Sequence, residues 1–266
     1  MKKINLLWLV AIILLSIGFA SCSDDDDNKF TIYKNVGTEI DGAIYEKVKS
    51  YEAKIGGFSL FAKGGTGSYS ASVEDPSIAN FLNTHEGHGK EYIVLEFSAL
   101  KVGSTKITIT DGEKSIVIPL TISSKSRPMY VEAVRADVDV DGEDLQEEIE
   151  EDVLKTQPVK AKGSFGMEFE TFEKGKVTVV PENNSTEKYE GTFEIENASG
   201  AIQYYHLTYN GATYKYMVEQ SIKSEKALGP ISLKWTLDLT DTYKQKYPNA
   251  TIRKVEYEME ILARWY

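Results

Sequence analysis

Residues 204–216 read YYHLTYNGATYKY, and this stretch decides how the second half of the chain folds. Asn-Gly between two runs of strand-forming residues is the strongest short-range signal for a two-residue β-hairpin loop. That loop fixes three cross-strand pairs, which are Tyr209 with Ala212, Leu207 with Tyr214, and Tyr205 with Tyr216. Because cross-strand partners share a face of the hairpin, four tyrosines and a leucine crowd one side of it.

The crowded side of the hairpin has two interpretations. It is either core, with the phenol hydroxyls reaching the rim of the fold, or a tyrosine-lined cavity or platform for a sugar or an apolar ligand. We expect core, because aromatic stripes pack inside a protein more often than they bind a ligand. Trp235 and Trp265 are the best candidates for the apolar surface opposite.

Alternation of apolar and polar residues continues from this hairpin through residues 127–266. It predicts eight strands, near 130–140, 164–172, 175–181, 188–197, 201–209, 212–222, 231–239 and 251–264. Two short helices are expected near 143–155 and 240–247. Eight antiparallel strands with one apolar face predict a closed up-and-down β-barrel, and the alternative is an open sheet packed on the first helix.

Shorter alternating runs with glycine-rich turns fill residues 30–126 and predict a β-sandwich. The stretch SSKSRP at 123–128 indicates a linker. The charge also changes there, because residues 28–126 are net neutral whereas residues 127–266 hold 26 acidic and 17 basic residues. The sequence therefore predicts an all-β protein with one domain over 30–126 and a second over 127–266.

The overall composition limits the classes of partner. The chain has 266 residues, a formal net charge of −11 and one cysteine. Nucleic acids and anionic lipid headgroups require a basic surface, so we expect no nucleic-acid partner. A single cysteine excludes both a disulfide scaffold and a cysteine-based zinc site.

The N-terminus has the features of an export signal. Two lysines precede an apolar run over residues 4–19, and small residues then lead to Cys22. This run is shorter than the roughly 18–20 residues that a membrane-spanning helix needs. The pattern therefore predicts a cleaved signal peptide over residues 1–21 rather than a transmembrane anchor.

The residues around Cys22 resemble the lipobox of Bacteroidetes lipoprotein precursors, here Ala20-Ser21-Cys22. The resemblance implies cleavage before Cys22 and a diacylglycerol on its thiol. Residues 22–29 would then form an acidic tether that includes Asp24–Asp27. An acidic run directly after the lipidated cysteine resembles the signal that sends such lipoproteins to the cell surface, so the implied location is the outer membrane, facing outward.

Each predicted domain also resembles a known family. Residues 52–122 are similar to bacterial immunoglobulin-like group 2 domains, through GTGSYSASVEDPSIA at 65–79 and LKVGSTKITITD at 100–111. That resemblance implies a spacer or adhesive module. FEKGKVT at 172–178 and EGTFEI at 190–195 are similar to lipocalin-like domains of Bacteroidetes lipoproteins, although those domains open with a helix and this segment opens with a strand.

A calcium-loop pattern occupies residues 137–148, with Asp137, Asp139, Asp141 and Glu148 at ligand positions. However, the valines between the aspartates continue an alternating strand, and no helix leads into the segment. We interpret it as a strand with aspartates facing water, a turn, and a helix with acidic residues in its first turn. We therefore expect no metal and no cofactor.

The three histidines do not form a recognisable catalytic or metal site. His85 and His88 have a spacing that could hold a transition metal, but no third ligand is visible, and we interpret them as part of an exposed loop. His206 lies in mid-strand, and no serine or cysteine nucleophile can be paired with it. We identify no catalytic residue and expect that the protein is not an enzyme.

The function expected from these observations is that of a surface-displayed outer-membrane lipoprotein, a non-enzymatic binding module for a glycan or a small apolar ligand. The lipid on Cys22 would attach the protein to the outer membrane. The sequence does not identify the residues that bind the ligand. The alternative is a structural or adhesive protein with a protein partner and no ligand cavity. A polar and aromatic pocket would favour the first, and a filled barrel beside an exposed apolar patch the second.

Overall fold

The computed structural model describes residues 29–39, 42–87, 91–197, 202–221 and 231–263. The predicted signal peptide and tether, Cys22, His88 and Trp265 lie outside these ranges. The described chain is all-β with two short helices, as the sequence predicts. None of the helices in these ranges is both long enough and apolar enough to cross a membrane.

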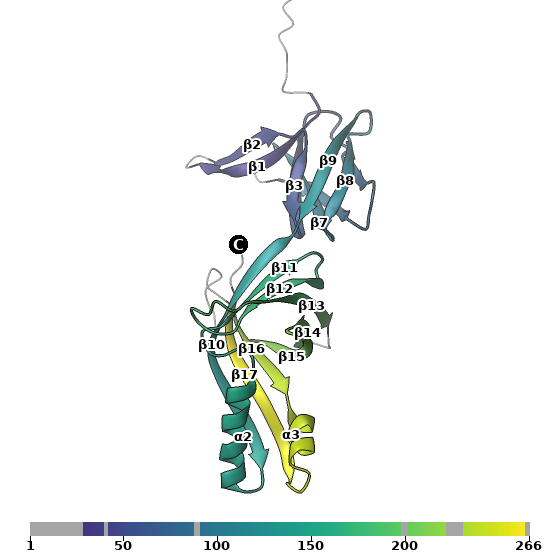
Figure 1. The fold of residues 1–266 in the computed structure, drawn as a ribbon. Helices are drawn as coiled ribbons and strands as arrows, with labels where there is room; N and C mark the ends of the chain where they lie inside the picture. The colour runs from purple at the N-terminus through teal and green to yellow at the C-terminus, as the bar shows by residue number, and fades with distance from the viewer. Residues whose placement is uncertain (1–28, 40–41, 88–90, 198–201, 222–230, 264–266) are drawn as a thin grey trace, which may run out of the picture.

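Two sheets and a hydrophobic core between them make up the N-terminal part (Figure 1). One sheet has the order β2-β1-β4-β7-β6, built from β1 Thr31–Glu39, β2 Gly42–Lys47, β4 Gly56–Lys63, β6 Ala79–Glu86 and β7 Ile93–Ala99. The other has the order β3-β9-β8-β5, built from β3 Tyr51–Lys54, β5 Ser70–Val73, β8 Gly103–Thr110 and β9 Ser115–Ser123. Every pair of strands is antiparallel except β3 with β9.

Eight strands in sequential order close into a barrel in the C-terminal part. They are β10 Lys125–Val140, β11 Ser164–Phe169, β12 Lys174–Val180, β13 Tyr189–Asn197, β14 Ile202–Tyr209, β15 Ala212–Ser221, β16 Ile231–Asp238 and β17 Ile252–Ala263. Helix α2, Glu143–Thr156, follows β10, and helix α3, Thr240–Lys246, precedes β17. The closed barrel is confirmed, and the open sheet is wrong. Figure 1 shows β10 and β17 running past the barrel to the two helices.

The hairpin of β14 and β15 has the register that the Asn-Gly loop predicts. Tyr209 pairs with Ala212, and Tyr205 pairs with Tyr216. Asn210 has φ +49° and Gly211 has φ +74°, the left-handed conformations that a tight hairpin loop requires. Local turn chemistry therefore sets which side chains enter the barrel.

The segment interpreted as a linker is instead the start of a barrel strand. Only Ser124 separates β9 from β10, and Pro128 lies within β10, opposite Gly166 of β11. Pairing of β10 with β17 begins one residue later, at Met129. A proline has no N–H to donate, so it fits where the strand is paired on one side only. The proposed domain boundary at residues 126 and 127 stays a prediction.

Aromatic side chains fill the barrel lumen. Trp235 is fully buried, and its ring centroid lies 5.1 Å from that of Phe165, 5.2 Å from Tyr205 and 5.3 Å from Tyr216. The hydroxyls of Tyr209 and Tyr216 lie 3.2 Å apart, so these phenols satisfy each other inside the lumen. The expectation that the crowded side of the hairpin is core is confirmed.

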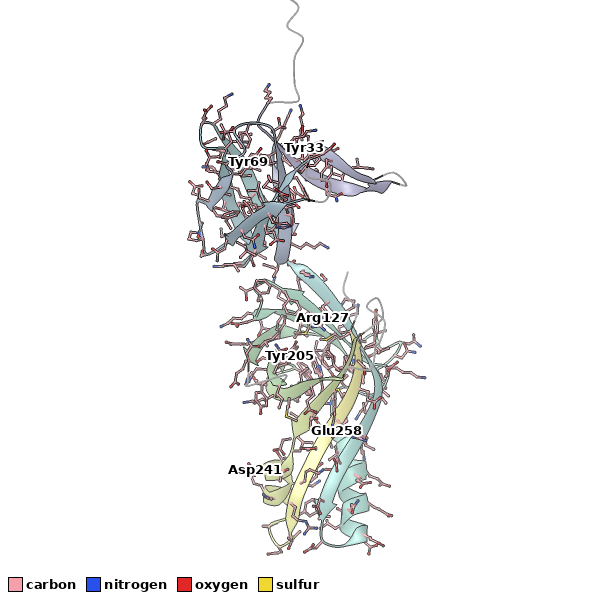
Figure 2. All side chains as sticks on the ribbon, turned by 180° about the vertical axis from the view of Figure 1, so that it is seen from behind. Tyr33, Tyr69, Arg127, Tyr205, Asp241 and Glu258 are labelled. Atoms are coloured by element: carbon pink, nitrogen blue, oxygen red, sulfur yellow. The ribbon has the colours of Figure 1, made fainter. Side chains whose placement is uncertain are left out.

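One polar pair lies within this apolar interior. The guanidinium of Arg127 donates a hydrogen bond to the hydroxyl of Tyr205 across the barrel (Figure 2). Burial lowers the pKa of Arg127, and the contact with Tyr205 partly offsets that effect. Burial likewise raises the pKa of Tyr205, and the contact with Arg127 partly offsets that rise.

Glycines at inward positions let neighbouring strands approach closely. A Cβ on Gly175 would lie 2.0 Å from the carbonyl oxygen of Glu168 and 2.9 Å from the ring of Phe193. A Cβ on Gly191 would lie 2.0 Å from the carbonyl oxygen of Thr208. Only glycine fits at these two points, where a barrel of this size must bend its strands.

Truncation of the central tryptophan should severely destabilise the barrel. We expect Trp235→Ala to lower the free energy of unfolding by about 3–5 kcal/mol, because the cavity left among three aromatic rings cannot collapse fully. Urea unfolding followed by circular dichroism measures the loss. Phe172→Ala is the control, because that ring is 49% exposed and its removal should cost far less. Equal losses in the two variants would contradict a tightly packed lumen.

Candidate functional site

The residues of the calcium-loop pattern point toward basic and phenolic partners rather than toward one another. Arg253 on β17 contacts the carboxylate of Asp139 at 2.6 Å and that of Asp141 at 2.7 Å. The hydroxyl of Tyr247 donates to Glu148 at 2.8 Å. The segment itself forms a strand, a turn at Gly142 and a helix, which agrees with our interpretation.

Two of the aspartates are electrostatically stabilised in their ionised form. Hydrogen bonds from Arg253 hold the pKa of Asp139 and that of Asp141 below their ordinary values. The same contacts raise the pKa of Arg253. The ten acidic residues of segment 137–152 are therefore partly neutralised by residues of β17 and α3.

The two histidines that the structure describes, His85 and His206, lie on different sheets. His85 belongs to β6 rather than to the loop that we expect from the sequence, and its Nδ1 lies 3.9 Å from Glu96. The alternating residues 79–86 pair with β7, and this pairing explains the difference. His206 lies in mid-strand on β14, as predicted, and its Nε2 is 2.9 Å from the carboxylate of Glu196.

A groove of about 690 Å³ lies against the barrel wall. Its lining comes from β12 to β15 and the turn before β12, and comprises Glu170, Lys174, Gly175, Thr192, Phe193, Glu194, Ile195, Glu196, His206, Thr208 and Thr213. In β13, Phe193 and Ile195 point into the core and are buried. Side chains alternate along a strand, so Thr192, Glu194 and Glu196 point outward, and most of the lining residues are likewise the outward residues of their strands. The groove is therefore on the outside of the barrel and not in the lumen.

Hydroxyl groups form one row across the groove. Thr192, Thr208 and Thr213 are direct cross-strand neighbours on three adjacent strands. The hydroxyls of Thr208 and Thr213 lie 2.9 Å apart, and either can donate. Each hydroxyl keeps further capacity to donate or accept, so this row can contact a ligand that carries hydroxyls of its own.

A charged row runs beside the hydroxyl row. Glu196 accepts from His206 and, at 3.3 Å, from Lys215, and these two contacts lower its pKa. Lys174 pairs with Glu194 at 2.9 Å. The Nζ of Lys215 also lies 4.2 Å from the ring centroid of Tyr204, so that an aromatic ring and charged groups stand next to the groove.

Sequence reasoning assigns the outward side of the hairpin but misses the groove. Three of its residues, His206, Thr208 and Thr213, alternate with the buried tyrosines and could be placed outside from the register alone. The lining residues from β12 and β13 join them only through the curvature of the barrel wall, which the register of the hairpin does not give. The signal that was available is the alternation Thr192, Glu194, Glu196 in β13.

Comparison with known proteins does not assign this chain to a family. No protein family and no curated protein matches the sequence. A Bacteroides ovatus protein of unknown function from structural genomics matches with 10% identity over 90% of this chain and 95% of that chain, at a TM-score of 0.32. Domains 5–6 of the S-layer protein SbsC match with 17% identity over 79% of this chain and 91% of that chain, at a TM-score of 0.24.

A second fragment of SbsC shows the same weak likeness. Its domains 4 and 5 match with 18% identity over 30% of this chain and 58% of that chain, at a TM-score of 0.24. Matches at these TM-scores carry no argument about the architecture or the function of this chain. The function must be argued from the residues of this chain.

The contacts of Arg253 predict a pH-dependent contribution to stability. Asp139 and Asp141 have lowered pKa values in the folded state, so their contribution is present above about pH 4, the unfolded pKa of aspartate, and is lost as the pH falls through their folded pKa values. We expect Arg253→Gln to lower the Tm at pH 7. The difference in Tm between this variant and the unmodified chain should become smaller as the pH falls below 4. Thermal unfolding across this pH range measures the difference, with Lys244→Gln as control. A constant difference would contradict the assignment.

Proposed function

We propose that this chain is a non-enzymatic binding module whose ligand lies in the outer groove of the barrel rather than in its lumen. The observation that supports this placement is the burial of Trp235 among three aromatic rings, which leaves the lumen filled. The groove on β12 to β15 is open to solvent and has the size of a small-molecule site.

The lining of the groove favours a glycan over a small apolar molecule. The hydroxyls of three threonines, together with three glutamates and His206, offer both donors and acceptors. The rings of Tyr205, Tyr209 and Tyr216 are buried and do not line the groove. A sugar presents hydroxyl groups that satisfy such a set, and a lipid-like ligand would leave it unpaired.

The location that we propose is the cell surface, with the chain held in the outer membrane by a lipid on Cys22. This rests on the sequence around Cys22 and on Asp24–Asp27. The two-sheet arrangement of residues 30–123 is compatible with an immunoglobulin-like spacer, and the sequential strand order of the barrel is compatible with a lipocalin-like domain.

A structural or adhesive role is the second candidate, and one feature favours it. Only Thr31–Tyr33 of β1 pair with β4, so the outer part of the β1–β2 hairpin extends beyond the sheet (Figure 1). Val36 and Ile44 on this hairpin are 47% and 38% exposed. A projecting hairpin with two exposed apolar side chains is suited to contact with another protein.

Glycan binding can be tested on the groove directly. We expect the purified chain to bind short neutral oligosaccharides on a glycan array. The double variant Thr192→Val, Thr208→Val should weaken this binding roughly tenfold, because two hydrogen bonds are lost. Isothermal titration with the retained glycan measures the change. Thr178→Val is the control, because its hydroxyl bonds Glu190 at 2.9 Å outside the groove. Absence of any retained glycan would favour the adhesive role.

The membrane anchor has a separate test. We expect Cys22→Ala to release the chain from the membrane fraction, because no other thiol can carry the lipid. Replacement of Asp24–Asp27 by alanines should preserve lipidation but abolish surface display, so that protease added to whole cells no longer digests the protein. An unacylated Cys22 in the native mature protein would contradict the anchor, and unchanged protease access would contradict the export role of the aspartates.

A further inference from the structure

Three carboxylates lie abreast on the outer face where β10, β17 and β16 are paired. Glu256 of β17 is the direct cross-strand neighbour of Asp137 on one side and of Asp238 on the other. Like charges directly opposite one another destabilise a sheet. Glu258, two residues further along β17, faces the same side, and Figure 2 places it between Tyr205 in the barrel and Asp241 on α3. The arrangement therefore attracts positive charge.

The carboxylate oxygens lie close enough together to share one hard cation. One oxygen each from Asp137, Glu256 and Glu258 lies within 4.8 Å of the others. Calcium takes about six to eight oxygen ligands in a flexible geometry, whereas magnesium demands a near-ideal octahedron, so carboxylates whose positions are set by the strand register suit calcium better. An all-oxygen donor set also excludes a preference for zinc or copper.

A buried hydroxyl next to the carboxylates points independently to a missing ligand. Thr236 is 3% exposed, and its Oγ1 makes no hydrogen bond with any described residue. Thr236 is the direct cross-strand neighbour of Glu258, so both side chains project from the same face of the sheet at adjacent positions. Buried hydroxyls in proteins are normally hydrogen-bonded or bound to an ion.

We propose that Asp137, Glu256 and Glu258 bind a calcium ion on the outer face of the barrel, with the hydroxyl of Thr236 as a further ligand. The site shares Asp137 with the calcium-loop pattern, but its other ligands come from β16 and β17 instead of the loop. Calcium would join three strands, β10, β17 and β16, at the place where the two long strands leave the barrel.

Basic side chains already neutralise part of this site, and the ion must displace them. Lys254 contacts Asp137 at 2.6 Å, and Glu258 is contacted by Arg135 and Lys234. These basic groups are 37–68% exposed, so they can turn toward water without loss of packing. Lys234 also has other carboxylates within reach, because its direct neighbours on β15 and β17 are Glu219 and Glu260.

Titration of the metal-free chain with calcium chloride alone tests the site. After dialysis against a chelator, we expect calcium to raise the Tm saturably at an ionic strength held constant with sodium chloride, with a Kd on the order of 10⁻⁴–10⁻³ M. Glu256→Gln should weaken binding at least about tenfold, since a neutral amide replaces a charged ligand. A Tm that responds to calcium no more than to sodium chloride would overturn the proposal.

Further variants distinguish this site from the loop. Thr236→Val should leave the Tm of the metal-free chain unchanged or higher, because it removes an unsatisfied buried hydroxyl, and yet should weaken calcium binding. Asp139→Asn and Glu260→Gln are matched controls that change a carboxylate outside the site, and both should bind calcium as the unmodified chain does. Binding lost in Asp139→Asn but retained in Glu256→Gln would assign the ion to the loop and refute the proposal.

Discussion

Closure of the barrel depends on the pairing of β10 with β17, its first and last strands. Their register runs from Met129 with Ala263 to Val140 with Ile252. All other barrel pairs join strands that follow one another in the chain, so this one pairing carries most of the loop-closure entropy. It also removes both free edges of the sheet, which would otherwise be available for pairing with other chains.

The same pairing organises the charges of the C-terminal part. Beyond the barrel, β10 and β17 continue as a ribbon, and α2 and α3 pack against it (Figure 1). Asp152 of α2 accepts from Tyr243 at 2.6 Å and from Lys246 at 2.7 Å, both on α3. Hydrogen bonds from these two residues lower the pKa of Asp152. The acidic segment 137–152 is thus stabilised in the folded chain by basic side chains of α3 and β17.

Sequence reasoning succeeds where local chemistry decides the structure. The Asn210-Gly211 loop fixes the register of β14 and β15, and alternation then assigns the buried tyrosines. The start of β10 at Lys125 could not be foreseen, because the polar and proline-containing segment before residue 129 becomes a strand only through its pairing with β11. Glu256 and Thr236 lie far from Asp137 in the sequence, and only the β10–β17–β16 register brings them together.

A filled lumen determines where this fold can act. Eight strands enclose an interior just wide enough for side chains, and here Trp235 and its aromatic neighbours occupy it. Strand alternation then sends every second residue outward, so polar groups accumulate on the wall in rows that cross several strands. The threonine row of the groove and the carboxylate row beside β17 are two such rows. Each row is set by the register between strands, so a shift of one residue in a strand would bury these polar groups and expose the core. The same strand register therefore specifies both the packing of the interior and the chemistry of the surface.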